Sequence, residues 1–263
     1  MRLKSFCLIL IVIGIGFSSS SIGQQAELPK DQISASEILR KNLIATGGLE
    51  AHKALETLVA SGEIHLDATH PIGEFKFSYK APGSDMLKVR MFGHGANWVG
   101  HRGGRPVSDW VNEGLRPTAP SDELCLECVI NGVNTWIVED DWRKLLQWDF
   151  SRDYNIELIG VGEVDKRLAY GLRFTPKKGG NAFVCFYDRE TFLLVRIDRS
   201  DWFRTRKNQE ATVHKVESIF RGYHAEGGIQ LPSVIAIPRP EGDVVFDVGK
   251  IKAGEPVKDS VFE

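Results

Sequence analysis

Alternation of apolar and polar residues with a period of two runs through much of this chain and limits its fold more than any other feature. The segments 64–68, 75–79 and 87–91 each alternate in this way. A period of two places apolar side chains on one face of a β-strand and polar side chains on the other. Pro71 and the sequence Ala-Pro-Gly at 81–83 separate the segments, at a spacing typical of antiparallel hairpins.

The alternation resumes after residue 168 and continues almost to the end of the chain. A tight turn is expected at 188–191, between two strands that form a hairpin. Strands are expected near residues 168–174, 182–187, 192–197, 211–223, 231–237 and 244–251. About nine or ten strands, without regular alternation of strand and helix, predict an α+β fold with one antiparallel sheet, curled or closed, and helices on one side.

Helices are predicted at two places outside this pattern. Ser34 and Glu37 have the spacing of a capping box, and Gly47-Gly48 ends the helix that they begin. A second short helix is expected from Leu49 to about Leu55.

The middle of the chain breaks the strand pattern, because glycine and proline are dense from Gly93 to about Asn134. An amphipathic helix is predicted beyond it, since Val138, Trp142 and Leu145 recur at helical spacing. We therefore expect one domain over residues 24–263, with a helical insertion near 100–150.

The N-terminus has the features of a secretory signal peptide. Arg2 and Lys4 precede an apolar run at 6–17, and Ser21 and Gly23 suit the −3 and −1 positions of a cleavage site. This run is shorter than the roughly 18 apolar residues that a membrane span needs. No cysteine follows the run where lipid would be attached. We expect residues 1–23 to be cleaved, which in a bacterial host would leave a soluble, unlipidated periplasmic protein.

Charge and motif content argue against several classes of function. The chain has 33 basic and 35 acidic residues, and its basic residues are scattered, so nucleic acid is an unfavourable partner. It contains no nucleophile elbow, zinc-protease motif or phosphate-binding loop, and none of its seven histidines form an i, i+4 pair on a predicted helix. We therefore predict no catalytic residue, no metal site and no cofactor, and interpret the protein as a non-enzyme.

Cys125 and Cys128 form the one cysteine pair whose spacing is suggestive. Val129 stands where haem attachment needs histidine, and Cys185 alone cannot complete a four-cysteine zinc site. A structural disulfide or two buried thiols are favoured over a redox centre, since the β-rich pattern lacks a βαβ unit. Cys185 lies in a strand that is apolar on both faces, and is expected to be a packed core thiol.

Six short segments carry a resemblance that spans most of the chain. They are residues 45–51 (ATGGLEA), 58–62 (LVASG), 79–83 (YKAPG), 187–196 (YDRETFLLVR), 228–233 (GIQLPS) and 256–262 (PVKDSVF). In this order they resemble the outer-membrane lipoprotein-sorting (LolA-like) family. Two departures concern Ala81, which stands where family members have an arginine, and the insertion around Cys125 and Cys128, which is longer than usual.

The resemblance implies an incomplete antiparallel β-barrel whose concave apolar face is covered by helices. It further implies a non-catalytic monomer that carries the acyl chains of lipoproteins or lipids across the periplasm, between protein partners of the inner and outer membranes. Burial recovers about 0.8 kcal/mol per methylene, so a long acyl chain would gain on the order of 10 kcal/mol in a dry cavity before costs.

The candidates for the lining of such a cavity are inward strand residues and the apolar side of the predicted lid helix. They are Phe75, Phe77, Tyr79, Leu87, Val89, Met91, Leu172, Phe174, Trp142, Leu145 and Leu146. Cores use the same residue types as apolar pockets, so a packed interior is the alternative for each of them.

Two other functions remain open on the sequence. An envelope sensor or protein-interaction module could use the same scaffold with a filled interior and no lipid cargo. An exported enzyme would require polar residues such as His65, His94, His101 and Glu63 to gather in one pocket.

Overall fold

The computed structural model describes residues 33–66, 70–93, 95–111, 135–203, 212–239 and 242–262. The predicted signal peptide (1–23), Cys125, Cys128 and His94 lie outside these residues. The helices are α1 (Ala35–Ala45), α2 (Gly48–Ala54), α4 (Thr135–Leu146) and a 3-10 turn, η1 (Asp259–Phe262). The strands are β1 (Thr57–Leu66), β2 (Pro71–Lys80), β3 (Ser84–Met91), β4 (Gly95–Arg102), β5 (Arg105–Val111), β6 (Tyr154–Val164), β7 (Arg167–Pro176), β8 (Phe183–Asp188), β9 (Leu194–Phe203), β10 (Thr212–Arg221), β11 (His224–Glu226), β12 (Ile229–Leu231), β13 (Val234–Ile237) and β14 (Val244–Ala253).

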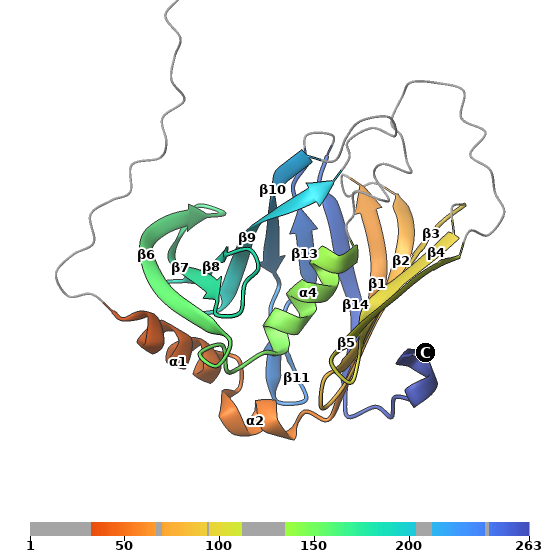
Figure 1. Cartoon of the computed structure of the whole chain (residues 1–263), viewed down its shortest axis with the longest axis horizontal. Helices are drawn as coiled ribbons and strands as arrows, with labels where there is room; N and C mark the ends of the chain where they lie inside the picture. The colour runs from red at the N-terminus through yellow and green to blue at the C-terminus, as the bar shows by residue number, and fades with distance from the viewer. Residues whose placement is uncertain are drawn as a thin grey trace, which may run out of the picture.

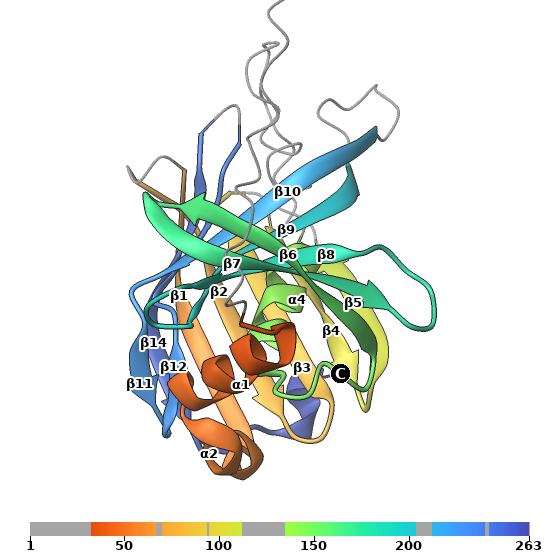
Figure 2. The same cartoon turned by 90° about the vertical axis from the view of Figure 1, so that its left-hand side faces the viewer.

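One antiparallel sheet of twelve strands forms the body of the molecule, in the order β5-β4-β3-β2-β1-β14-β13-β10-β9-β8-β7-β6. The sheet curves around α4, with α1 and α2 at one end (Figures 1 and 2). β5 and β6 end the strand order within the described residues, and β11 pairs with β12 in a separate hairpin. The predicted α+β fold with a curled antiparallel sheet and helices on its concave side is therefore confirmed.

Two strands of this sheet lie in the glycine-rich region where the sequence analysis expected none. β4 and β5 form a hairpin at Gly103-Gly104, both of which have positive φ. A Cβ atom at Gly100 would lie 2.1 Å from the carbonyl oxygen of Asp85, so glycine permits the β3–β4 approach here. Glycine at these positions serves the pairing of strands. Within the expected helical insertion near 100–150, the described residues form part of this hairpin and the amphipathic helix α4, so the helix is confirmed.

The helix-turn-helix at the N-terminal end packs on the β11–β12 hairpin. The Ser34 side chain accepts a hydrogen bond from the Glu37 amide at 3.2 Å, as the capping box predicts. Gly47 ends the turn with a φ of 114°, and a Cβ atom there would lie 2.0 Å from the carbonyl oxygen of Gly228. The amide of Gln230 donates to the carbonyl of Thr46 at 3.1 Å. Two of the segments that carry the family resemblance are therefore in direct contact.

The inward faces of the strands and the apolar sides of α1 and α4 share one hydrophobic core. Ile38 of α1 and Val138 of α4 are fully buried in it. Cys185 is a buried free thiol, as predicted, and burial raises its pKa to about 12. No helix among the described residues has both the length and the apolar character that a membrane crossing requires.

Candidate functional site

The concave face of the sheet brings together all the residues that the sequence analysis placed around a cavity. Nine of the eleven are buried in the core, and Tyr79 and Leu145 are partly buried against it. The β2–β3 register places Phe75 opposite Val89 and Phe77 opposite Leu87, so both strands present one continuous apolar surface. The assignment of these residues to an acyl cavity remains a prediction.

Helix α4 occupies the centre of this concave face (Figure 1). Trp142 is fully buried and stacks on Phe77, with ring centroids 5.1 Å apart and an interplanar angle of 12°. The ring of Trp142 therefore covers Phe77 on β2. The interior around Phe77 is packed by the protein itself.

An aromatic cluster that the sequence analysis did not single out continues the apolar face beyond α4. Phe174 and Phe183 are opposite each other in the β7–β8 register, and their rings stack with centroids 5.0 Å apart. Phe150 and Tyr154 contact Phe174 edge-on. Only Phe174 was among the predicted residues, because the other three are separated from it in the chain and share no periodic pattern with it.

A small hollow lies where α1 meets the end of α4. It measures about 20 Å³, and its lining includes Leu43, His52, Leu145 and Trp148. His52 is buried, and burial lowers the pKa of its imidazole. The Trp148 side chain is 43% exposed beside it.

Charged residues hold one side of α4 to strands β3 and β4, and we call Asp85, His101, Glu139 and Arg143 the His101 cluster. Asp85 and His101 are opposite each other in the β3–β4 register. His101 Nδ1 lies 3.1 Å from Glu139 Oε1 and 3.5 Å from Asp85 Oδ2. Arg143 Nε lies 3.6 Å from Asp85 and 3.7 Å from Glu139. Both carboxyl groups are almost wholly buried, so the cluster is a desolvated contact between helix and sheet.

Burial is the main reason that the pKa of Glu139 is raised to about 9, and the hydrogen bond with Asp85 and the Asp85 charge add to the rise. Glu139 therefore keeps its proton at neutral pH. A protonated Glu139 can donate a hydrogen bond to Asp85, which two carboxylates could not share.

The His101 cluster is also the one group of potential metal ligands among the described residues. The donor atoms of Asp85, His101 and Glu139 lie within 4.8 Å of one another. These atom types suit a divalent cation. However, the guanidinium of Arg143 already contacts both carboxyl groups and lies 3.4 Å from His101 Nε2. We therefore interpret the cluster as a network of hydrogen bonds and ion pairs.

A second network, the Arg199 cluster, holds the other side of α4 to β9 and β10. It comprises Arg199, Asp140, Asp141, Lys144 and Ser218. Arg199 donates to Asp140 at 3.2 Å, to Ser218 Oγ at 2.8 Å and to the fully buried Asp141. Lys144 pairs with Asp140 and lies over the ring of Phe183, 4.4 Å from its centroid. Burial raises the pKa of Asp141 although Arg199 opposes the rise.

The sequence analysis missed both networks, because their members come from strands and a helix far apart in the chain. Of the polar residues named for an enzyme site, His65 pairs with Glu63 at 3.4 Å on β1 and His101 faces α4, while His94 lies outside the described residues.

No protein-family model matches this chain, and no curated protein sequence matches it. Solved structures match its fold over most of its length. An outer membrane lipoprotein-sorting protein domain from Vibrio parahaemolyticus has 11% identity over 86% of this chain and 95% of its own, with a TM-score of 0.50. A LolA superfamily protein from Nitrosomonas europaea has 12% identity over 88% and 98%, with a TM-score of 0.46.

A DUF1329 family protein from Desulfovibrio piger has 15% identity over 88% of this chain and 98% of its own, with a TM-score of 0.45. At such identities the comparison concerns the fold. The curled sheet covered by helices, which the sequence segments implied, is the arrangement that the Vibrio parahaemolyticus domain shares. This chain therefore has the LolA-like fold of outer membrane lipoprotein-sorting domains.

Proposed function

We propose that this protein is a non-catalytic envelope carrier that holds an acyl chain of a lipid or lipoprotein on the concave face of its sheet, beneath α4. The observation that carries the proposal is the way in which α4 is attached. It covers a continuous apolar surface with Trp142, while charged networks hold both of its sides to the sheet.

The balance of forces favours exchange of α4 for a hydrocarbon. Charged groups in the two networks regain water when they separate, which offsets much of the Coulomb energy lost. The apolar face beneath α4 gains no favourable interaction with water when α4 moves away, so its exposure costs free energy. An acyl chain that replaces Trp142 on Phe77 would keep this face dry, so binding and movement of α4 are coupled. Release of the chain would return α4 to the closed position of the structure.

The test measures acyl binding in the full chain and in two arginine variants. Fluorescent fatty acid is mixed with the wild type, Arg143→Gln and Arg173→Gln, and the rate and amplitude of the fluorescence change are recorded. Arg143 and Arg173 have similar exposure, 45% and 49%, but Arg173 pairs with Glu157 on the outside of the sheet edge. We expect Arg143→Gln to bind the probe severalfold faster than the wild type. Loss of the Arg143 cation weakens the attachment of α4 to β3 and β4, so the helix moves aside more readily. Arg173→Gln should behave as the wild type.

Native mass spectrometry of protein purified from its own host provides an independent measurement. Acyl-bearing species should accompany the chain. Repeated recovery of ligand-free protein, together with no response to fluorescent fatty acid in any of the three proteins, would rule the carrier out.

A protein-interaction module is the second candidate, and the stacking of Trp142 on Phe77 favours it because it fills the interior. In that case the same native mass spectra should show one stoichiometric protein bound to the chain and no lipid. Arg143→Gln would then leave the fatty-acid response at zero.

A further inference from the structure

The convex face of the sheet carries a row of cationic side chains that the concave site does not use. Strand register aligns five outward residues across β4, β3, β2, β1 and β14. They are Trp98, Lys88, Lys76, Ser61 and Lys250. Three of the five are exposed lysines.

The lysines of this row have no acidic partner among the described residues. Lys76 is directly opposite Lys88, and like charges in that position destabilise a sheet. Lys88 lies over the ring of Trp98, 5.4 Å from its centroid. Lys76 and Lys250 form no ion pair with any described residue. Their charges are therefore available to a ligand.

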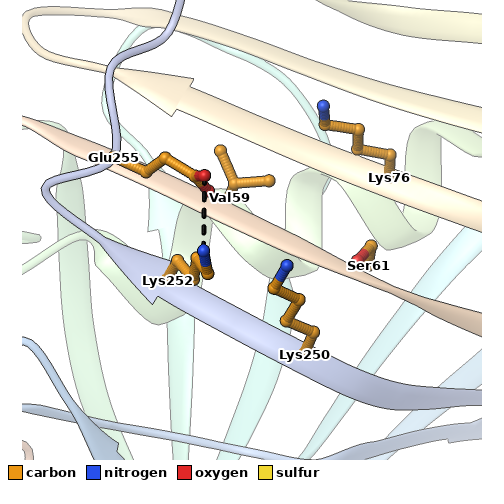
Figure 3. A pocket seen from close by; sticks show the side chains of 6 residues that line it. All are labelled: Val59, Ser61, Lys76, Lys250, Lys252 and Glu255. Atoms are coloured by element: carbon orange, nitrogen blue, oxygen red, sulfur yellow. Dashed lines mark hydrogen bonds and ion pairs between the residues drawn. The ribbon is translucent and has the colours of Figure 1, made fainter.

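A hollow of about 200 Å³ lies between these lysines (Figure 3). Ser61 of β1 lies between Lys76 of β2 and Lys250 of β14, and is the cross-strand neighbour of both. Val59, Lys252 and Glu255 complete the lining, and Lys252 pairs with Glu255 at 3.4 Å.

A β-bulge shapes this part of the sheet. The β1–β14 register shifts between Ser61 and Glu63. A Cβ atom at Gly62 would lie 1.8 Å from the carbonyl oxygen of Asp247, so the bulge depends on glycine there. Beyond the bulge, Glu63 is opposite Glu74 of β2 and Asp247 of β14, and Arg90 of β3 pairs with Glu74 at 3.7 Å. Negative charge therefore borders the lysines on β1 and β14.

We propose that this hollow, the convex lysine site (Ser61, Lys76 and Lys250), binds a phosphate-type oxyanion. Lys76 and Lys250 supply two ammonium groups from strands on either side of the anion, and the Ser61 hydroxyl donates a hydrogen bond from below. Lysine ammonium groups bind phosphate oxygens as point charges, and such charge-assisted hydrogen bonds are stronger than neutral ones. The anion relieves the repulsion between Lys76 and Lys88. The source is either free phosphate or the head group of an anionic lipid, and the site is independent of the acyl proposal.

The test compares the purified wild type with two double variants. Lys76→Gln/Lys250→Gln removes two charges from the site. Lys53→Gln/Lys178→Gln removes the same charge from exposed positions elsewhere. Inorganic phosphate is titrated by calorimetry at low ionic strength. In parallel, each protein is mixed with phosphatidylcholine vesicles that contain or lack phosphatidylglycerol. The N-terminal apolar run is common to all three proteins, so differences between them report on the lysines.

We expect Lys76→Gln/Lys250→Gln to weaken binding about tenfold or more, and the control to remain near the wild type. If the protein binds inorganic phosphate and shows no preference between the two kinds of vesicle, free phosphate is the source. If it binds only the vesicles that contain phosphatidylglycerol, a lipid head group is the source. Without ligand, Lys76→Gln/Lys250→Gln should melt at or above the wild-type temperature, because it removes the repulsion between Lys76 and Lys88. Equal binding by both double variants, or no binding of either probe by the wild type, overturns the proposal. Neither result bears on fatty-acid uptake.

Discussion

At the scale of single residues, glycines determine where parts of this chain touch. Gly47 has a left-handed backbone and leaves no room for a side chain beside the carbonyl of Gly228. The double glycine that ends α1 is therefore needed twice, for the turn and for contact with the β11–β12 hairpin.

Gly47→Ala should lower the free energy of unfolding by at least about 1–2 kcal/mol, because alanine is strained at this φ and overlaps the hairpin backbone. Chemical denaturation followed by circular dichroism measures the change. Gly249→Ala is the matched control, since a Cβ atom at Gly249 has open space around it. Similar losses in both variants would show that the contact with Gly228 is unimportant.

Glu139 is the residue whose titration most directly connects pH with stability. Its folded pKa of about 9 is above the ordinary value of 4.5, so the folded protein retains a proton that the unfolded chain releases. The resulting stabilisation is complete below about pH 4.5 and is lost as the pH rises towards about 9. Asp85, His101, Arg143 and Asp140 are the charged or titratable groups around it.

Glu139→Gln should therefore flatten the decline of the melting temperature between about pH 5.5 and pH 8.5, because glutamine keeps a neutral hydrogen-bonding group with no proton to lose. Thermal melts at several pH values provide the measurement. Glu157→Gln, on an exposed glutamate of β6, should leave the wild-type slope unchanged. If the melting temperatures of the wild type and Glu139→Gln changed with pH in parallel, Glu139 would not be the group that links pH to stability.

At the scale of elements, α4 combines two kinds of attachment. Its central tryptophan packs on Phe77, and its charged residues reach β3 and β4 on one side and β9 and β10 on the other. Apolar packing stabilises the closed position, while the networks orient the helix on the sheet.

Trp142→Ala should cost about 3–5 kcal/mol of stability, as expected when a large buried aromatic side chain is removed. Added fatty acid should recover part of this loss, because ligand that binds only the folded state stabilises it. Trp148→Ala, at a tryptophan that is 43% exposed, should cost much less and respond less to fatty acid. Urea denaturation with and without ligand gives both quantities. If Trp142→Ala is destabilised and added fatty acid does not raise its stability, the protein-interaction module is favoured.

At the scale of the whole molecule, the two faces of one sheet serve different chemistry. The concave face is apolar and covered, while the convex face presents the lysine row. In the carrier that we propose, this division would shield the acyl cargo on one side and leave the other side free to contact charged surfaces.

Export is the whole-molecule prediction that follows from the N-terminal sequence. In a bacterial host the mature protein should begin near Gln24 and be recovered in the periplasmic fraction. Intact mass measurement and N-terminal sequencing test this. Substitution of Ile11 and Ile13 by aspartate should leave the precursor uncleaved, because an apolar run is needed for export. A precursor that retains residues 1–23 in the wild type would disprove the signal peptide.

The sequence by itself determined the strand type, the two N-terminal helices and α4, because each follows from a local period or a cap. The strand pattern allowed either a curled or a closed sheet, and only the family resemblance implied an incomplete barrel. The sequence pattern did not predict the glycine-rich strands β4 and β5, because strand pairing there depends on close approach of the backbones. Only the tertiary structure placed Trp142 on Phe77, joined Asp85 and His101 to Glu139, and aligned Lys76 with Lys250. These contacts depend on register between distant segments, which no periodic pattern within a single segment specifies.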